Sequence, residues 1–274
     1  MCPPPPVFSE EDLRTAAHHL CSLMEGLTSQ VFSIRTSDDL VAFLNAVAIL
    51  RHLNLSPLSS DPPCATAFFL NLYHTLITHA TLVFGPPNGI RQISKFISRM
   101  SYEVSGDVVS VAELESNVMR APMPPPDLAF MKLLLPRAGS PYAFRMRTPE
   151  VRLNFAMNNG MIPELRSVVI YRRGCLEAQL EATTGGYLRS QVNMPRPYTR
   201  RVVLLPKVLQ WYKEDVGSSN LEILTYVKKY LGPELKEGLG QVLDGSGFGS
   251  GKIKCRFRDI ATRMSFLYCV VEEP

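Results

Sequence analysis

The stretch AFFLNLYHTLITHATLVFGPP, residues 67–87, constrains the fold more than any other part of the chain. It is apolar on all sides of a helix, and such helices lie inside a protein core or a membrane. It also carries Asn71, His74 and His79, and Gly85-Pro86 stops it early, which makes it a poor membrane span. We therefore predict a central buried helix over about residues 62–84 and no membrane span.

Helix-start signals place this helix and two others before it. Ser9 opens a capping box, and an amphipathic helix follows it. A second helix begins at TSDD with Ser37 as its predicted N-cap. Ser60 or Asp61 caps the central helix, and Pro62 suits its first turn.

The rest of the chain mixes strand and helix patterns. SYEVSGDVVS predicts a short hairpin, and helices are expected at about residues 174–190 and 205–231, the second interrupted near Gly217. Four further segments read as strands: VRLNFAMNN, RSVVIYRR, KIKCRFRD and MSFLYCVV.

These patterns predict an α+β fold. A helical layer around the central helix of about residues 62–84 is expected to pack on a small, mostly antiparallel sheet, and a distant papain- or transglutaminase-like architecture is one interpretation. Residues 1–36 are expected to form an N-terminal tail and helix, and residues 37–274 a single domain.

The six cysteines lie far apart, and none forms a Cys-x-x-Cys pair. This spacing argues against zinc ribbons and thioredoxin-like sites, so we expect no metal and no cofactor. Reduced thiols and a start without a basic and apolar leader fit a cytoplasmic protein.

Cys64 and His74 are the candidates for catalysis. Cys64 falls in the first turn of the central helix, where the helix dipole lowers the pKa of a thiol. His74 lies ten residues further along the same helix, about 15 Å away, which is too far for it to act as the base. A cysteine-type hydrolase or transferase is therefore the alternative and not the favoured function.

The polar residues of the central helix are candidates for a binding site or for a buried network. Asn71 and His74 face one side, whereas His74 and His79 point apart and cannot share a metal. An unpartnered buried amide or imidazole is costly, so a structural network is the favoured interpretation.

Positive charge is concentrated in the middle of the chain. Residues 131–210 carry thirteen Lys and Arg, eleven of them Arg, against four acidic residues, a net of +9, whereas the whole chain is +4. Guanidinium groups bind carboxylates and phosphates in a planar geometry. An acidic protein or RNA is therefore a candidate partner for the arginines of residues 137–201, with these predicted contacts: Arg145, Arg147, Arg152, Arg196, Arg200 and Arg201.

Five blocks together resemble the domain-of-unknown-function 547 family, in a eukaryotic, protist-like form, over residues 37–262. The blocks are AFFLNLYHTLITHATLVFGPP, SYEVSGDVVSVAELESNVMRAPM, RLNFAMNNG, LEAQLEATTGGYLRS and LLPKVLQWYKEDVG. Asn71, Tyr73 and His79 match the family pattern, as do Trp211-Tyr212 and Asp215. The resemblance implies no activity.

The departures from the family pattern bear on catalysis. Many members have histidine at the places of Ser116 and Asn154 and cysteine at the place of Asn159. If those members use a Cys/His site, this chain has lost its nucleophile and its base. The resemblance therefore favours a non-catalytic cytoplasmic interaction or scaffold module, a pseudoenzyme, with Asn71, Tyr73, His74, His79, Asn154 and Asn159 as candidate binding residues.

Overall fold

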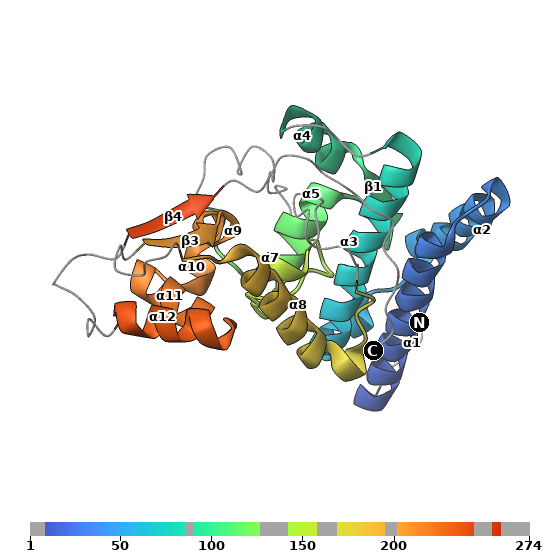
Figure 1. Cartoon of the computed structure of the whole chain (residues 1–274). Coiled ribbons are helices and arrows are strands. Elements are labelled where there is room, and N and C mark those ends of the chain that lie inside the picture. Colours follow the sequence, from blue (N-terminus) through green and yellow to red (C-terminus); the bar gives the residue numbers. More distant parts are fainter. Residues whose placement is uncertain are drawn as a thin grey trace.

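The computed structural model describes residues 9–85, 90–126, 142–157, 169–194, 202–243 and 254–258. Helix α3 (Pro62–Phe84) runs through the middle of the helical layer (Figure 1). Every residue from 64 to 77 is buried, which confirms the predicted central helix. The Asp61 side chain accepts a hydrogen bond from the Cys64 backbone N–H, and Gly85 ends the helix at φ +74°. Such a φ suits glycine because it has no Cβ.

Two helices precede α3, and the first packs along it (Figure 1). Helix α1 (Glu10–Ser33) begins with the predicted capping box at Ser9. Helix α2 (Ser37–Val47) is capped by Thr36 and not by Ser37, because the Thr36 hydroxyl accepts the Asp39 N–H. The turns η1 (Ala48–His52) and η2 (Ser56–Ser60) lead from α2 to α3.

The fold is α+β, as predicted, but its strands are few. The predicted hairpin is present as β1 (Ser101–Val104) and β2 (Asp107–Ser110), with Ser105 and Gly106 at positive φ in the turn. Strands β3 (Val202–Pro206) and β4 (Lys254–Arg258) pair in parallel. Within the described ranges there are thus two separate two-stranded sheets, one antiparallel and one parallel, instead of one mostly antiparallel sheet.

Helix α5 (Val111–Glu113) follows α4 (Ile90–Arg99) and the hairpin, and continues as a π-helical turn, η3 (Leu114–Met119). All six residues of η3 are buried. Single π-helical turns are often found at functional sites.

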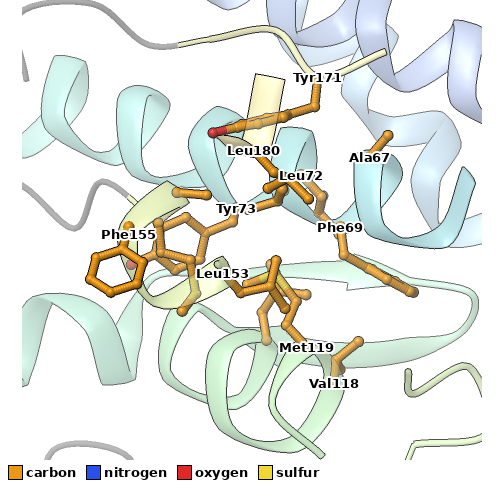
Figure 2. Close-up of a cluster of buried hydrophobic side chains, with 14 of the residues drawn as sticks. Ala67, Phe69, Leu72, Tyr73, Val118, Met119, Leu153, Phe155, Tyr171 and Leu180 are labelled. Atoms are coloured by element: carbon orange, nitrogen blue, oxygen red, sulfur yellow. The ribbon is translucent and has the colours of Figure 1, made fainter. Parts of the chain in front are cut away.

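Helix α7 (Leu153–Ala156) replaces the strand predicted for VRLNFAMNN, up to Met157. Leu153 and Phe155 alternate like strand residues, but all four residues of α7 are buried, so the alternation did not mark an inner and an outer face. Leu153 and Phe155 reach the core beside Tyr73 and Met119 (Figure 2).

The C-terminal half is built from short helices. Helix α8 (Leu176–Gln191), preceded by η4 (Arg173–Cys175), confirms the prediction for residues 174–190. The helix predicted over 205–231 is instead the end of β3 followed by three helices. The predicted interruption near Gly217 is present, and the backbone also leaves the helical region at Tyr212. The helices of this region are α9 (Val208–Trp211), α10 (Lys213–Val216), α11 (Asn220–Lys228) and α12 (Pro233–Leu243).

The other predicted strands have different outcomes. Residues 254–258 of KIKCRFRD form β4, whereas residues 169–172 of RSVVIYRR are not in a strand. MSFLYCVV and the first residues of RSVVIYRR lie outside the described residues.

Helix α3 bears on two predictions, the absence of a membrane span and the domain boundary at residue 36. Among the described helices it alone is long and apolar enough to span a membrane, and the same properties suit the buried core helix that it forms here. The boundary predicted at residue 36 stays a prediction, but α1 shares its core with α3: the Cys21 thiol donates to the Cys64 carbonyl oxygen at 3.2 Å.

Candidate functional site

Asn71 and His79 were both predicted to be buried polar residues with hydrogen-bond partners. Both have a partner, but only Asn71 is buried, whereas His79 is half-buried. The Asn71 amide makes two hydrogen bonds of 2.8 Å with the backbone N–H and carbonyl of Tyr171. His79 Nδ1 lies 2.8 Å from the Tyr102 hydroxyl. Both contacts connect α3 to other segments of the fold. They are the arrangement expected of a structural network.

His74 is buried in the core. Its ring stacks on Tyr171, with ring centroids 6.0 Å apart. Burial lowers the pKa of His74 to about 4, although a hydrogen bond with the Ala156 backbone acts in the opposite direction. His74 is therefore neutral at pH 7 and holds no charge for acid catalysis.

A charged group lies inside the protein, between η3, α7 and α10. Arg120 is 2% exposed, and its Nη1 lies 2.6 Å from Asp215 Oδ2. Asn154 accepts a hydrogen bond from the same Nη1 and donates from Nδ2 to Asp215 Oδ2 at 2.7 Å. Arg120 Nη2 donates to the Pro124 carbonyl at 3.0 Å. A buried ion pair needs such additional hydrogen bonds to offset its desolvation.

A tyrosine joins this group to a second buried carboxylate. The Arg120 guanidinium lies 3.9 Å from the centre of the Tyr212 ring, and the Tyr212 hydroxyl donates to Glu115 Oε1 at 2.7 Å. Burial raises the pKa of Glu115, while the Tyr212 hydroxyl and Arg120 partly offset the effect. Burial, with the nearby Glu115, also raises the pKa of Tyr73. We call this set the buried charge network: Glu115, Arg120, Asn154, Tyr212 and Asp215.

The buried charge network contains part of the site that the family resemblance implied. Asn154 was a predicted binding residue, and Tyr212 and Asp215 were noted only as matches to the family pattern, whereas Arg120 and Glu115 were missed. Their only sequence signal is their place in the SYEVSGDVVSVAELESNVMRAPM block, around the π-helical turn. Ser116, on that turn, donates to the Ala112 carbonyl at 2.8 Å and to Asn117 Oδ1 at 3.1 Å. Asn159 lies outside the described residues.

Cys64 has a histidine nearby, but it is not His74. Cys64, His18 and Asp61 place their sulfur, nitrogen and oxygen atoms within 4.8 Å of one another. The argument from the sequence considered only His74 and so missed His18, which comes from α1. Cys64 is nevertheless 0% exposed, and the neighbouring Cys21 thiol and burial raise its pKa. Both properties oppose a role as a nucleophile.

Of the described arginines between residues 137 and 201, some contact other groups of the protein and some do not. Arg152 contacts three carboxylates, at 2.5–3.6 Å. Arg172 lies 3.8 Å from Glu25, and Arg189 donates to the Tyr230 carbonyl. Arg173 lies 2.7 Å from Asp61. Three of the other predicted contacts, Arg196, Arg200 and Arg201, are outside the described ranges.

Arg145 and Arg147 are exposed and border a groove beside the start of α3. The groove has a volume of about 200 Å³. Among the described residues, no carboxylate forms an ion pair with either guanidinium. The other residues that define this arginine-bordered groove are Leu55, Ser56, Leu58, Ser59, Pro62, Ala65, Ala143, Phe144, Met146 and Thr148.

Comparison with protein families gives a match to the family described as "Protein of unknown function, DUF547", over residues 59–188. The matched segment runs from the end of η2 through α3, the hairpin, the π-helical turn and α7 into α8. Residues 59–188 are therefore similar to the DUF547 family. No curated protein and no solved structure matches the chain.

The DUF547 segment contains both candidate regions. Asn71, Arg120 and Asn154 lie within it, as do Arg145 and Arg147. Tyr212 and Asp215 lie beyond it, so the buried charge network joins the DUF547 segment to the helices that follow. This match does not test the prediction that residues 37–274 form a single domain.

Proposed function

We propose that the chain is a non-catalytic protein-interaction module that binds an acidic peptide segment in the arginine-bordered groove. The observation that carries this proposal is the pairing of an apolar recess with two exposed guanidinium groups that lack a described carboxylate partner. The proposal also places the protein in the cytoplasm, where a reduced Cys64 is expected.

The buried charge network supports a non-catalytic role. Asn154 Oδ1 and Asp215 Oδ2 accept hydrogen bonds from Arg120, Asn154 Nδ2 donates to Asp215 Oδ2, and the Tyr212 ring covers the guanidinium. A general acid or base must reach a proton on a substrate. The members of this network are instead buried and bonded to each other, which is the property of a structural element.

The dimensions of the groove favour a peptide side chain over a free metabolite. Small-molecule sites usually enclose about 300–1,000 Å³, and this groove has about 200 Å³. Leu58 and Phe144 supply apolar contact for one inserted side chain. Arg145 and Arg147 then lie where carboxylates on either side of that side chain can bind. The occupant is therefore a peptide with one large apolar residue flanked by Asp or Glu.

RNA binding has less support. The described residues between 142 and 194 contain six arginines, and four of them (Arg152, Arg172, Arg173 and Arg189) already contact groups of the protein. A surface that follows a phosphate backbone needs several unpaired cations in a row. Two arginines beside an apolar recess fit a short acidic peptide better.

Fluorescence anisotropy with short peptides tests the proposal. The probe is a labelled peptide with Leu or Phe between glutamates, and its matched control has Gln in place of Glu. We expect the acidic peptide to bind more tightly, with an affinity that falls as salt is raised. Arg145→Glu/Arg147→Glu should abolish binding.

Two further variants separate the groove from a general charge effect. Lys95→Glu/Lys236→Glu changes the net charge equally at exposed positions outside the groove and should leave binding intact. Ser59→Trp fills the groove without changing charge and should abolish binding. Equal loss in both charge-reversed proteins, or no effect of Ser59→Trp, would overturn the proposal. Preferential binding of a single-stranded RNA oligonucleotide would do the same.

A further inference from the structure

Two helices bring three potential metal ligands, His18, Asp61 and Cys64, to one place, with the Cys21 thiol beside them. His18 and Cys21 lie three residues apart on α1, and Asp61 and Cys64 lie three residues apart at the start of α3. Residues with this spacing point to the same side of a helix. The two sequence fragments, HHLC and DPPC, are forty-three residues apart and meet because α1 packs on α3.

The distances within this group suit a metal ion. The donor atoms of His18, Asp61 and Cys64 all lie within 4.8 Å of one another, and His18 Nε2 is 3.6 Å from Asp61 Oδ2. Zinc bonds of about 2.0–2.3 Å in a tetrahedron separate neighbouring ligand atoms by roughly 3.3–3.8 Å. Small side-chain adjustments therefore bring the three atoms to coordinating positions.

We propose that His18, Asp61 and Cys64 form a site for a borderline-soft divalent cation, with Zn²⁺ the best match. Imidazole, carboxylate and thiolate are the protein ligands that Zn²⁺ binds. Three protein ligands leave the fourth position to water. His18 is half exposed while Asp61 and Cys64 are buried, so the ion enters from the α1 side.

Charge balance is favourable in this buried position. On binding, the Cys64 thiol releases its proton to solvent and its sulfur bonds to the ion. One thiolate and one carboxylate then neutralise the two positive charges. The Cys21 thiol remains a neighbour that donates to the Cys64 backbone carbonyl.

Arg173 regulates the affinity of the proposed site. Its Nε lies 2.7 Å from Asp61 Oδ2, so the guanidinium occupies an oxygen that the cation needs. The Arg173 side chain is 43% exposed, which leaves it room to move aside. Removing this competing cation should tighten metal binding. This response distinguishes a real ligand set from adventitious binding elsewhere.

Cobalt(II) is the probe for the experiment, because a cobalt–thiolate bond gives a charge-transfer absorption band. The full-length reduced protein is stripped with chelator and titrated with Co²⁺, and Zn²⁺ is then added in competition. We expect the band to appear and Zn²⁺ to remove it. Cys64→Ser should abolish the band, and His18→Ala should weaken binding about tenfold or more. Arg173→Ala should tighten it.

Matched controls come from the same helices. His19→Ala removes the neighbouring exposed histidine, and Cys175→Ser removes a half-buried thiol outside the cluster. Both should behave like the unchanged protein. Because Cys64→Ser can affect folding, circular dichroism is measured on each variant. His18 is half exposed, so His18→Ala tests the metal site a second time at a position outside the core. The absence of the band, its retention in folded Cys64→Ser, or equal losses in His18→Ala and His19→Ala would overturn the proposal.

Discussion

The side chain of Asn71 substitutes for a missing strand neighbour of Tyr171. Its amide oxygen accepts the Tyr171 N–H and its amide nitrogen donates to the Tyr171 carbonyl, both at 2.8 Å, across 100 residues of sequence. A single side chain thus satisfies both backbone groups of a buried residue that is in no helix or strand. The polar residue in the middle of the apolar helix has a structural reason to be there.

Asn71→Ala should lower the free energy of unfolding by about 1–3 kcal/mol, because it leaves two buried backbone groups without partners. The measurement is equilibrium urea unfolding followed by circular dichroism. Ser22→Ala, an exposed change on α1, is the control and should have little effect. Equal stability of the two variants would show that the Tyr171 backbone finds other partners.

Asp215→Ala should be more harmful, because it leaves the Arg120 guanidinium buried with its carboxylate removed. Breaking a buried pair from one side typically lowers the free energy of unfolding by about 3–5 kcal/mol. Glu177→Ala breaks another arginine–carboxylate contact, with Arg152, but Glu177 is 82% exposed. Denaturant unfolding should therefore show a much smaller change for Glu177→Ala. Similar losses for the two variants would contradict the structural role of the buried charge network.

His74 should make the protein less stable in mild acid. Its pKa is lowered to about 4 in the folded protein, against about 6.5 in an unfolded chain. Between these values the unfolded chain binds a proton that the folded protein does not, so stability rises with pH across this window. The contribution is fully present above pH 6.5 and is lost as pH falls towards 4.

The test is to compare the unchanged protein with His74→Phe in urea unfolding from pH 7 to pH 4. The difference in unfolding free energy between the two should change by on the order of 3 kcal/mol across this range. Parallel curves would mean that His74 titrates normally in the folded protein.

Cys64 should react slowly with iodoacetamide in reduced, chelator-treated protein. It is 0% exposed and its pKa is raised, whereas Cys175 is partly exposed. Peptide mass spectrometry over a time course should show Cys175 labelled well before Cys64. Labelling of Cys64 first would restore the cysteine-enzyme alternative.

Local sequence signals predicted α3 well. Its apolar run, the Asp61-Pro62 start and the Gly85 end each depend on nearby residues, so they can be read directly from the chain. The same kind of signal failed at α7, because both faces of that short helix are buried and alternation carries no information there.

The candidate sites were harder to predict, since their members meet only in three dimensions. Arg120 contacts Asp215 across 95 residues, and Tyr212 contacts Glu115 across 97. His18 was overlooked as a neighbour of Cys64 because it lies on a different helix. The parallel pairing of β3 with β4 likewise joins segments about fifty residues apart, which no local pattern specifies.

The packing of α1 on α3 has a practical consequence for dissecting the protein. The DUF547 match begins at residue 59, whereas α1 ends at Ser33. A fragment limited to residues 59–188 would lack α1 and so expose the side of α3 that α1 covers, including the surroundings of Cys64. It would also lack Asp215, the ion-pair partner of Arg120. The smallest autonomous folding unit therefore extends beyond the family match on both sides, and a fragment meant to stand alone must begin before α1 and continue past α10.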